Sequence, residues 1–204
     1  LVVEGKLDIT FSSGKIVKAS SRESSLKDLV HQRLFAMGFV NLSFNKLSDD
    51  NWIAEILNTK QISEQELEGV IRLIEEDLVY KIPLLYGSSF TFDRQARFEN
   101  LDQRIELSPT QLLLDFVELE ASPLRQFDEA SASEECVVIS DIDQIPEDVS
   151  ALDRRLLKLV GPAVALEILY MQLPLNRFNF EMTLLTLEQK RLIDFDVRAK
   201  SIKS

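Results

Sequence analysis

The chain has 204 residues, of which 45% are hydrophobic, and a formal net charge of −11. A chain of this length buries a sizeable core on folding. It has no apolar run of about 18 residues and no signal-like segment, so we expect no membrane insertion and a cytoplasmic location. Its one cysteine, Cys136, excludes an internal disulfide.

The charge is unevenly distributed along the chain. Residues 1–117 carry 13 basic and 18 acidic groups, residues 118–148 carry 1 and 10, and residues 149–204 carry 9 and 6. Because phosphate neutralisation by Lys and Arg supplies most non-specific affinity for nucleic acid, only the last segment could tolerate DNA. The middle segment is typical of an acidic linker.

The first predicted element is a β-hairpin over residues 6–20. Apolar and polar residues alternate up to Phe11, and Ser13 and Gly14 supply a turn. Leu1 to Val3 is expected to end a strand that feeds the hairpin. A helix should then begin after Ser25 and stop at Gly38, followed by strand character over residues 39–44.

His31 lies off the apolar stripe of that helix and has no Asp, Ser or Cys at a catalytic spacing, which indicates a structural histidine. Residues 51–58 predict a short helix. Ser63 and Glu66 form a capping box that opens a longer helix, whose acidic face includes Glu75 and whose interior contains Gly69.

Two further features complete the amino-terminal half. Residues 34–44 and 84–92 both run from an apolar helix end through a glycine to a short strand, a weak internal echo. Ser108 and Pro109 then predict a helix start. The expected buried side of this helix consists of Leu112, Leu113, Phe116, Val117 and Leu119.

Four stretches resemble a known family, in the family's order: Phe11-x-x-Gly14-Lys15-Ile16-Val17-x-Ala19; Ile53-Ala54-Glu55-Ile56-Leu57 with Ile62-Ser63-x-x-x-Leu67; Tyr86-Gly87-x-x-Phe90-x-Phe92; and Leu107-Ser108-x-x-x-Leu112-Leu113-Leu114 leading to Phe127-Asp128-Glu129. They are similar to the bacterial PATAN-like domain over residues 1 to about 129, without the family's opening helices. The resemblance implies a non-catalytic interaction module joined to signalling domains, and it supplies no catalytic or ligand-binding residues.

The segment from Ile56 to Leu67 also resembles the amino-terminal domain of secretion and pilus ATPases, some of which bind cyclic di-GMP. The ligand motif of that family, an Arg-Leu-Gly start, is replaced here by Trp52-Ile53-Ala54. A small-ligand or nucleotide sensor therefore stays only as a second alternative.

Residues 130–147 are expected to form the acidic linker, with an edge strand at Val137 to Ile139. Asp141 and Asp143 lack the glycine and distal glutamate of a calcium loop. Beyond them, apolar stripes predict helices from Asp148 to Val160, from Val164 to Met171 and after Asn176, then a strand over residues 192–195. This order is similar to a winged-helix domain over residues 148–204.

A DNA-reading helix should expose Arg, Lys, Asn or Gln. The third helix instead presents Glu181 and Glu188, which would face phosphate. Protein docking or dimerisation therefore fits better than DNA reading. Under the DNA alternative the contacts would come from four residues: Arg177, Lys190, Arg191 and Arg198.

No phosphate loop, dinucleotide fingerprint, zinc motif or nucleophile elbow occurs in the sequence, so no catalytic, cofactor-binding or metal-binding residue is assigned. The sequence thus predicts an α+β protein. We expect a non-enzymatic bacterial signalling or scaffold protein, acting in a two-component or motility-type pathway by binding other proteins, with a homodimer left open. The alternative is a DNA-binding transcription regulator.

Overall fold

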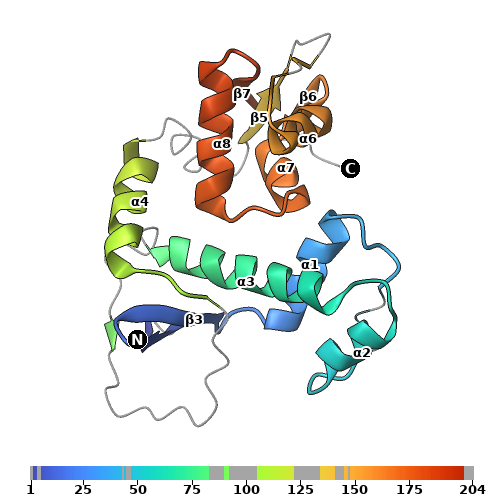
Figure 1. Ribbon diagram of the computed structural model, residues 1–204, viewed down its shortest axis with the longest axis vertical. Coiled ribbons are helices and arrows are strands. Elements are labelled where there is room, and N and C mark those ends of the chain that lie inside the picture. The colour runs from blue at the N-terminus through green and yellow to red at the C-terminus, as the bar shows by residue number, and fades with distance from the viewer. Residues whose placement is uncertain are drawn as a thin grey trace. The chain divides into compact units, whose positions relative to one another are not determined.

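The computed structural model describes residues 2–3, 6–42, 44, 47–82, 90–91, 105–121, 134–140, 145–146 and 148–199 (Figure 1). These residues form seven helices and two small antiparallel sheets, which confirms the predicted α+β class. Contacts within the chain divide it into two units, Leu1–Phe116 and Val117–Ser204. The division falls inside helix α4 (Pro109–Ala121).

The sheet of the first unit is built on the predicted hairpin. Strands β2 (Leu7–Ser12) and β3 (Lys15–Ser21) pair directly, and β1 (Val2–Val3) and β4 (Phe90–Thr91) extend the sheet in the order β3-β2-β1-β4. Ser13 and Gly14 have φ values of 51° and 77°. Both are left-handed, as a tight two-residue hairpin turn requires, so the hairpin prediction is confirmed.

The outer edge of β3 is bonded to the segment that leads into α4. The Ile16 amide donates to the Leu107 carbonyl at 2.9 Å, and the Leu107 amide donates back at 3.0 Å. A hydrogen bond from the Ile105 amide to the Val17 carbonyl continues this contact. The start of α4 is therefore tied to the sheet.

The first unit also contains three helices, α1 (Leu26–Ala36), α2 (Trp52–Asn58) and α3 (Glu64–Tyr80), of which α3 contacts β3 of this sheet and α1 packs on α3. The predicted caps are present at Ser25 and at Ser63, where the capping box with Glu66 is complete. Their shared core consists of Val30, Leu34, Leu42, Phe44, Trp52, Ile56, Ile62, Leu67, Val70, Ile71 and Ile74. Figure 1 shows α3 alongside β3, with which it is in contact.

Two expectations for this unit are wrong. The described residues among 39–44 form turns and irregular backbone instead of a strand, and Leu42 and Phe44 join the helical core. Glu75, assigned to the solvated face of α3, is buried, and so is Arg33 on α1.

The second unit has a three-stranded sheet and three helices. Strands β5 (Glu134–Ile139), β6 (Ala163–Ala165) and β7 (Asp194–Ala199) lie in the order β6-β5-β7. β5 was expected to be an edge strand within a solvated linker, but it is the central strand. Val137 and Val138 point to opposite faces of the sheet and are both buried, and β5 pairs with β6 along one edge and with β7 along the other.

Helices α6 (Ala151–Val160), α7 (Leu166–Gln172) and α8 (Arg177–Gln189) enclose the second core. Asn176 caps α8 and Gly161 ends α6, as the sequence predicts, and Ser150 caps α6. The core consists of Val138, Leu156, Leu157, Val160, Leu166, Leu169, Tyr170, Leu173, Phe180, Leu184, Leu187 and Ile193. Ile168, expected inside, is exposed.

Gly69 lies within α3, and a Cβ built on it meets no atom within 4 Å. We expect Gly69→Ala to stabilise the protein by about 1 kcal/mol, because alanine restricts the unfolded chain and favours the helix. Urea unfolding monitored by circular dichroism measures this change. A loss of stability would show that the site needs glycine.

Candidate functional site

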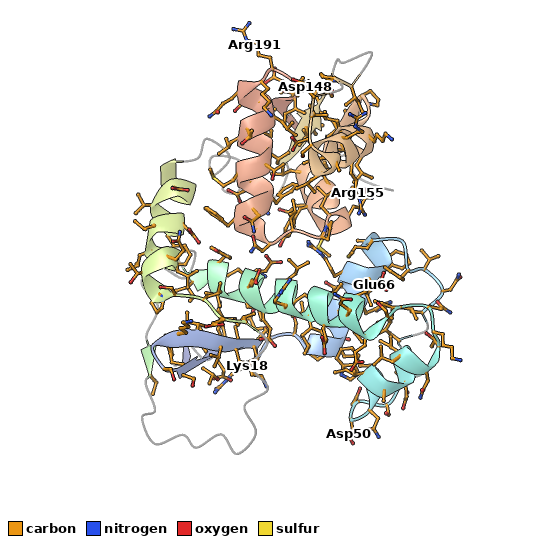
Figure 2. All side chains as sticks on the ribbon, in the orientation of Figure 1. Lys18, Asp50, Glu66, Asp148, Arg155 and Arg191 are labelled. Atoms are coloured by element: carbon orange, nitrogen blue, oxygen red, sulfur yellow. The ribbon has the colours of Figure 1, made fainter. Side chains whose placement is uncertain are left out.

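The four residues proposed to contact nucleic acid do not form one surface. Arg177 is the first residue of α8, whereas Lys190 and Arg191 follow its last residue, and Arg198 lies on β7. A helix of this length separates its ends by about 20 Å. Figure 2 shows Arg191 projecting from the far end of α8.

The Arg177 side chain is engaged in contacts within the second unit. Its Nε donates to Oε1 of Glu181, its Nη1 donates to Oε1 of Glu167 at 3.1 Å, and its guanidinium lies 5.4 Å from the ring centroid of Tyr170. Glu181 is only 3% exposed, so the expectation that it faces phosphate is wrong. This cluster joins α7 to α8.

A more prominent feature is the set of side-chain contacts that hold α4 against Tyr80 of α3. The carboxylate of Asp115, 5% exposed, accepts a hydrogen bond from Tyr80 Oη at 2.7 Å and another from Gln111 Nε2 at 2.8 Å. The Tyr80 ring also meets Phe116 edge to face, with centroids 6.0 Å apart. Leu112 is buried one turn before Phe116.

These contacts fix which side of α4 faces outward. Successive residues are rotated by about 100° around a helix, so Leu113, Leu114 and Val117 share the side opposite Leu112 and Asp115. They are 65%, 56% and 66% exposed. The prediction that Leu113 and Val117 are buried is therefore wrong. Asp115 occupies the inward side of the helix, although sequence periodicity assigns a carboxylate to solvent.

The surroundings of this apolar face are acidic. Residues 105–121 contain Glu106, Asp115, Glu118 and Glu120 but no Lys or Arg. Asp115 points inward and Glu118 is exposed, while Glu106 forms an ion pair with Lys15 at the end of the hairpin. We call Leu113, Leu114 and Val117, with Glu118 at the margin, the α4 face.

A second exposed apolar site lies at the end of α1. Phe35 and Val40 are 58% and 60% exposed. The half-buried His31 stacks on Phe44 at 4.6 Å and meets Phe35 edge to face at 6.4 Å. In this arrangement His31 acts as a packing residue between an exposed aromatic ring and the core.

Comparisons with protein-family models, with curated proteins and with solved structures found no match to this chain. Within the described ranges, no three His, Cys, Asp or Glu side chains gather as a metal site would require. Asp141 and Asp143 lie outside those ranges. Among the described helices, none has both the length and the hydropathy to cross a bilayer.

The Tyr80–Asp115 contact predicts a pH effect. Burial, and next the hydrogen bond to Asp115, raise the pKa of Tyr80 well above its usual value near 10. The folded chain then keeps this proton when the unfolded chain has lost it, so stability is full below about pH 10 and falls above it. Tyr80→Phe should lessen this alkaline loss, measured by urea unfolding between about pH 8 and pH 11. If the unfolding free energy falls with pH as steeply in Tyr80→Phe as in the native protein, the hydrogen bond between Tyr80 and Asp115 is contradicted.

The Arg177–Glu181 pair predicts strong coupling. Arg177→Met leaves the Glu181 carboxylate buried without its main cation and should cost about 3 kcal/mol of unfolding free energy. The double variant Arg177→Met/Glu181→Met removes both charges and should recover most of that loss. Chemical denaturation of the two single variants and the double variant measures the coupling energy. Additive losses would show that the two side chains act independently.

Proposed function

We propose that this chain is a non-enzymatic bacterial signalling or scaffold protein that works in the cytoplasm by docking other proteins, and that the α4 face is its docking surface. The observation that supports this is the exposure of Leu113, Leu114 and Val117 on a helix whose rotation is fixed by a buried carboxylate. Contiguous exposed apolar side chains with a polar margin are typical of protein interaction sites.

The charge around the face indicates the chemistry of its partner. No cation lies in residues 105–121, and residues 118–148 carry 10 acidic groups against 1 basic group. A second α4 would bring like charges together, which is unfavourable. The partner that fits is an amphipathic helix of another protein, with two or three apolar anchors flanked by Lys or Arg.

The two units support the proposal in different ways. We assign residues 1 to about 129 to a PATAN-like interaction module in a two-component or motility-type pathway, on the resemblance of the hairpin and the capped helices that follow it. We assign residues 148–204, which lie in the second unit, to a winged-helix-like element. Its support is the order of three helices around the three-stranded sheet, with the central strand β5 supplied from the amino-terminal side.

The test uses the tagged full chain to capture partners from a bacterial lysate, followed by mass spectrometry and by reconstituted binding of the captured protein. We expect Leu113→Ser/Val117→Ser to weaken that binding at least tenfold, because two anchor contacts are lost. The matched control, Phe35→Ser/Val40→Ser, removes two apolar side chains of similar exposure from another site and should leave binding unchanged.

Binding should also weaken as salt rises from about 50 mM to about 500 mM, because the proposed attraction is between an acidic margin and a basic partner. Equal binding by both double variants would reject the α4 face. A salt-independent affinity would reject the basic partner.

The two alternative functions have weaker support. DNA binding would have to use Lys190 and Arg191, since Arg177 is engaged with Glu181 and Glu167. Tight, salt-sensitive gel-shift binding that is lost in Lys190→Ala/Arg191→Ala would favour a transcription regulator. A nucleotide sensor would appear as a thermal shift, because a ligand at one hundred times its Kd adds about 2.7 kcal/mol.

A further inference from the structure

Helix α8 has an apolar side chain at the centre of the side that faces away from its own core. Phe180, Leu184 and Leu187 are fully buried in the second core. Successive residues are rotated by about 100° around a helix, so Met182, two positions from both Phe180 and Leu184, lies on the opposite side. A helix that covers a core normally carries charged and polar residues there.

No residue on this outward side of α8 is charged. Within about 60° of Met182 around the helix lie three apolar and three uncharged polar side chains: Phe178, Met182 and Leu185, and Asn179, Thr186 and Gln189. The apolar side chains are half-buried, Leu185 partly against the second core, and the polar ones are exposed. We call these six residues the α8 face. Depletion of charge together with Phe and Met is the composition of the centre of an interface.

The hydroxyl groups on this side of the helix lose little when they are covered. The Thr186 hydroxyl donates to the Met182 carbonyl at 2.8 Å, and the Thr183 hydroxyl beside the face donates to the Asn179 carbonyl at 2.7 Å. Both donors are therefore satisfied inside the helix. Contact with another helix would leave neither hydroxyl hydrogen unpaired.

The α8 face is self-complementary for antiparallel helices. Its apolar flank consists of Phe178 and Leu185, four positions before and three positions after Met182. Its polar flank consists of Asn179 and Thr186, three positions before and four positions after. In an antiparallel pair related by a two-fold axis, apolar flank meets apolar flank, with Phe178 beside Leu185 of the second copy. In a parallel pair the apolar flank would meet the polar one.

We propose that α8 packs antiparallel against α8 of a second copy of this chain, with Met182 at the two-fold axis. The interface is isologous, as in most homodimers. Antiparallel packing also places the positive amino-terminal end of each helix beside the negative carboxyl-terminal end of the other.

The net charge of the chain favours a second copy at this face over a partner selected by charge. Two copies that each carry −11 repel one another, and contact through an uncharged face brings no like charges together. A basic or acidic partner would find no charge to recognise on the α8 face. Because one pair of 13-residue helices gives a small interface, the dimer should be weak, with a Kd on the order of 10 to 100 µM.

The test is sedimentation velocity of the full chain from about 5 µM to about 500 µM at about 0.15 M salt. The native protein should shift from 23.3 kDa toward twice that mass as concentration rises. Met182→Glu and Met182→Lys each place two like charges at the axis, so each variant alone should stay monomeric. The controls Ala54→Glu and Ala54→Lys add the same charges at an exposed position of α2 and should dimerise like the native chain.

Mixing the two Met182 variants is the decisive arm. The heterodimer has Glu opposite Lys at the axis, so the mixture should dimerise at least about tenfold more tightly than either variant alone. A variant that had merely lost its fold would not be rescued in this way.

A second measurement needs no added charge. In a Cys136→Ser background, Met182→Cys places the two thiols of a dimer side by side. A short bis-maleimide should therefore crosslink this variant into dimers, whereas Ala54→Cys at the same concentration should stay uncrosslinked.

Three results would each overturn the proposal: a native chain that is monomeric at every concentration, a Met182→Glu variant that dimerises like the native chain, or a mixture without any gain. The proposal does not rest on the α4 face. Leu113→Ser/Val117→Ser should dimerise normally, and Met182→Glu should bind the captured partner normally, so failure of α8 pairing and failure of the proposed function are distinguishable.

Discussion

The buried carboxylate of Asp115 determines which side of α4 faces solvent in the first unit. Both of its oxygens accept hydrogen bonds, from Tyr80 on α3 and from Gln111 on α4. A carboxylate buried without such donors would cost several kcal/mol, so α4 is held in the rotation that satisfies it. That rotation turns Leu113, Leu114 and Val117 outward. The docking function proposed above follows from this one polar contact more than from any apolar packing.

In the second unit, too, a buried carboxylate with polar partners fixes the orientation of a helix. Glu181 is buried on α8 and is matched by Arg177, which also reaches Glu167 and the face of Tyr170 on α7. Buried ion pairs contribute little net stability compared with apolar residues, but breaking one is costly. Their effect here is to fix the orientation of short helices. It also withdraws Arg177 from the surface, which weakens the case for DNA binding.

What the sequence predicted well was local. The caps at Ser25, Ser63 and Asn176 depend on a side chain and an amide three residues away, so their signals lie within one turn. The hairpin turn at Ser13 and Gly14 is equally local. The inward positions of Asp115, Glu75 and Glu181 were missed because helical periodicity places charges outside by default. Tyr80, the partner of Asp115, is 35 residues away along the chain. The central place of β5 depends on strands that follow it by about 25 and 60 residues, so no local pattern could reveal it.

The rotation of α4 is tested most directly by thiol accessibility. In a Cys136→Ser background, single cysteines at positions 112, 113 and 117 are labelled with a maleimide under native conditions. If α4 has this rotation, positions 113 and 117 react nearly as fast as in the unfolded chain, and position 112 reacts at least tenfold more slowly. Slow labelling at 113 and 117 with fast labelling at 112 would contradict it.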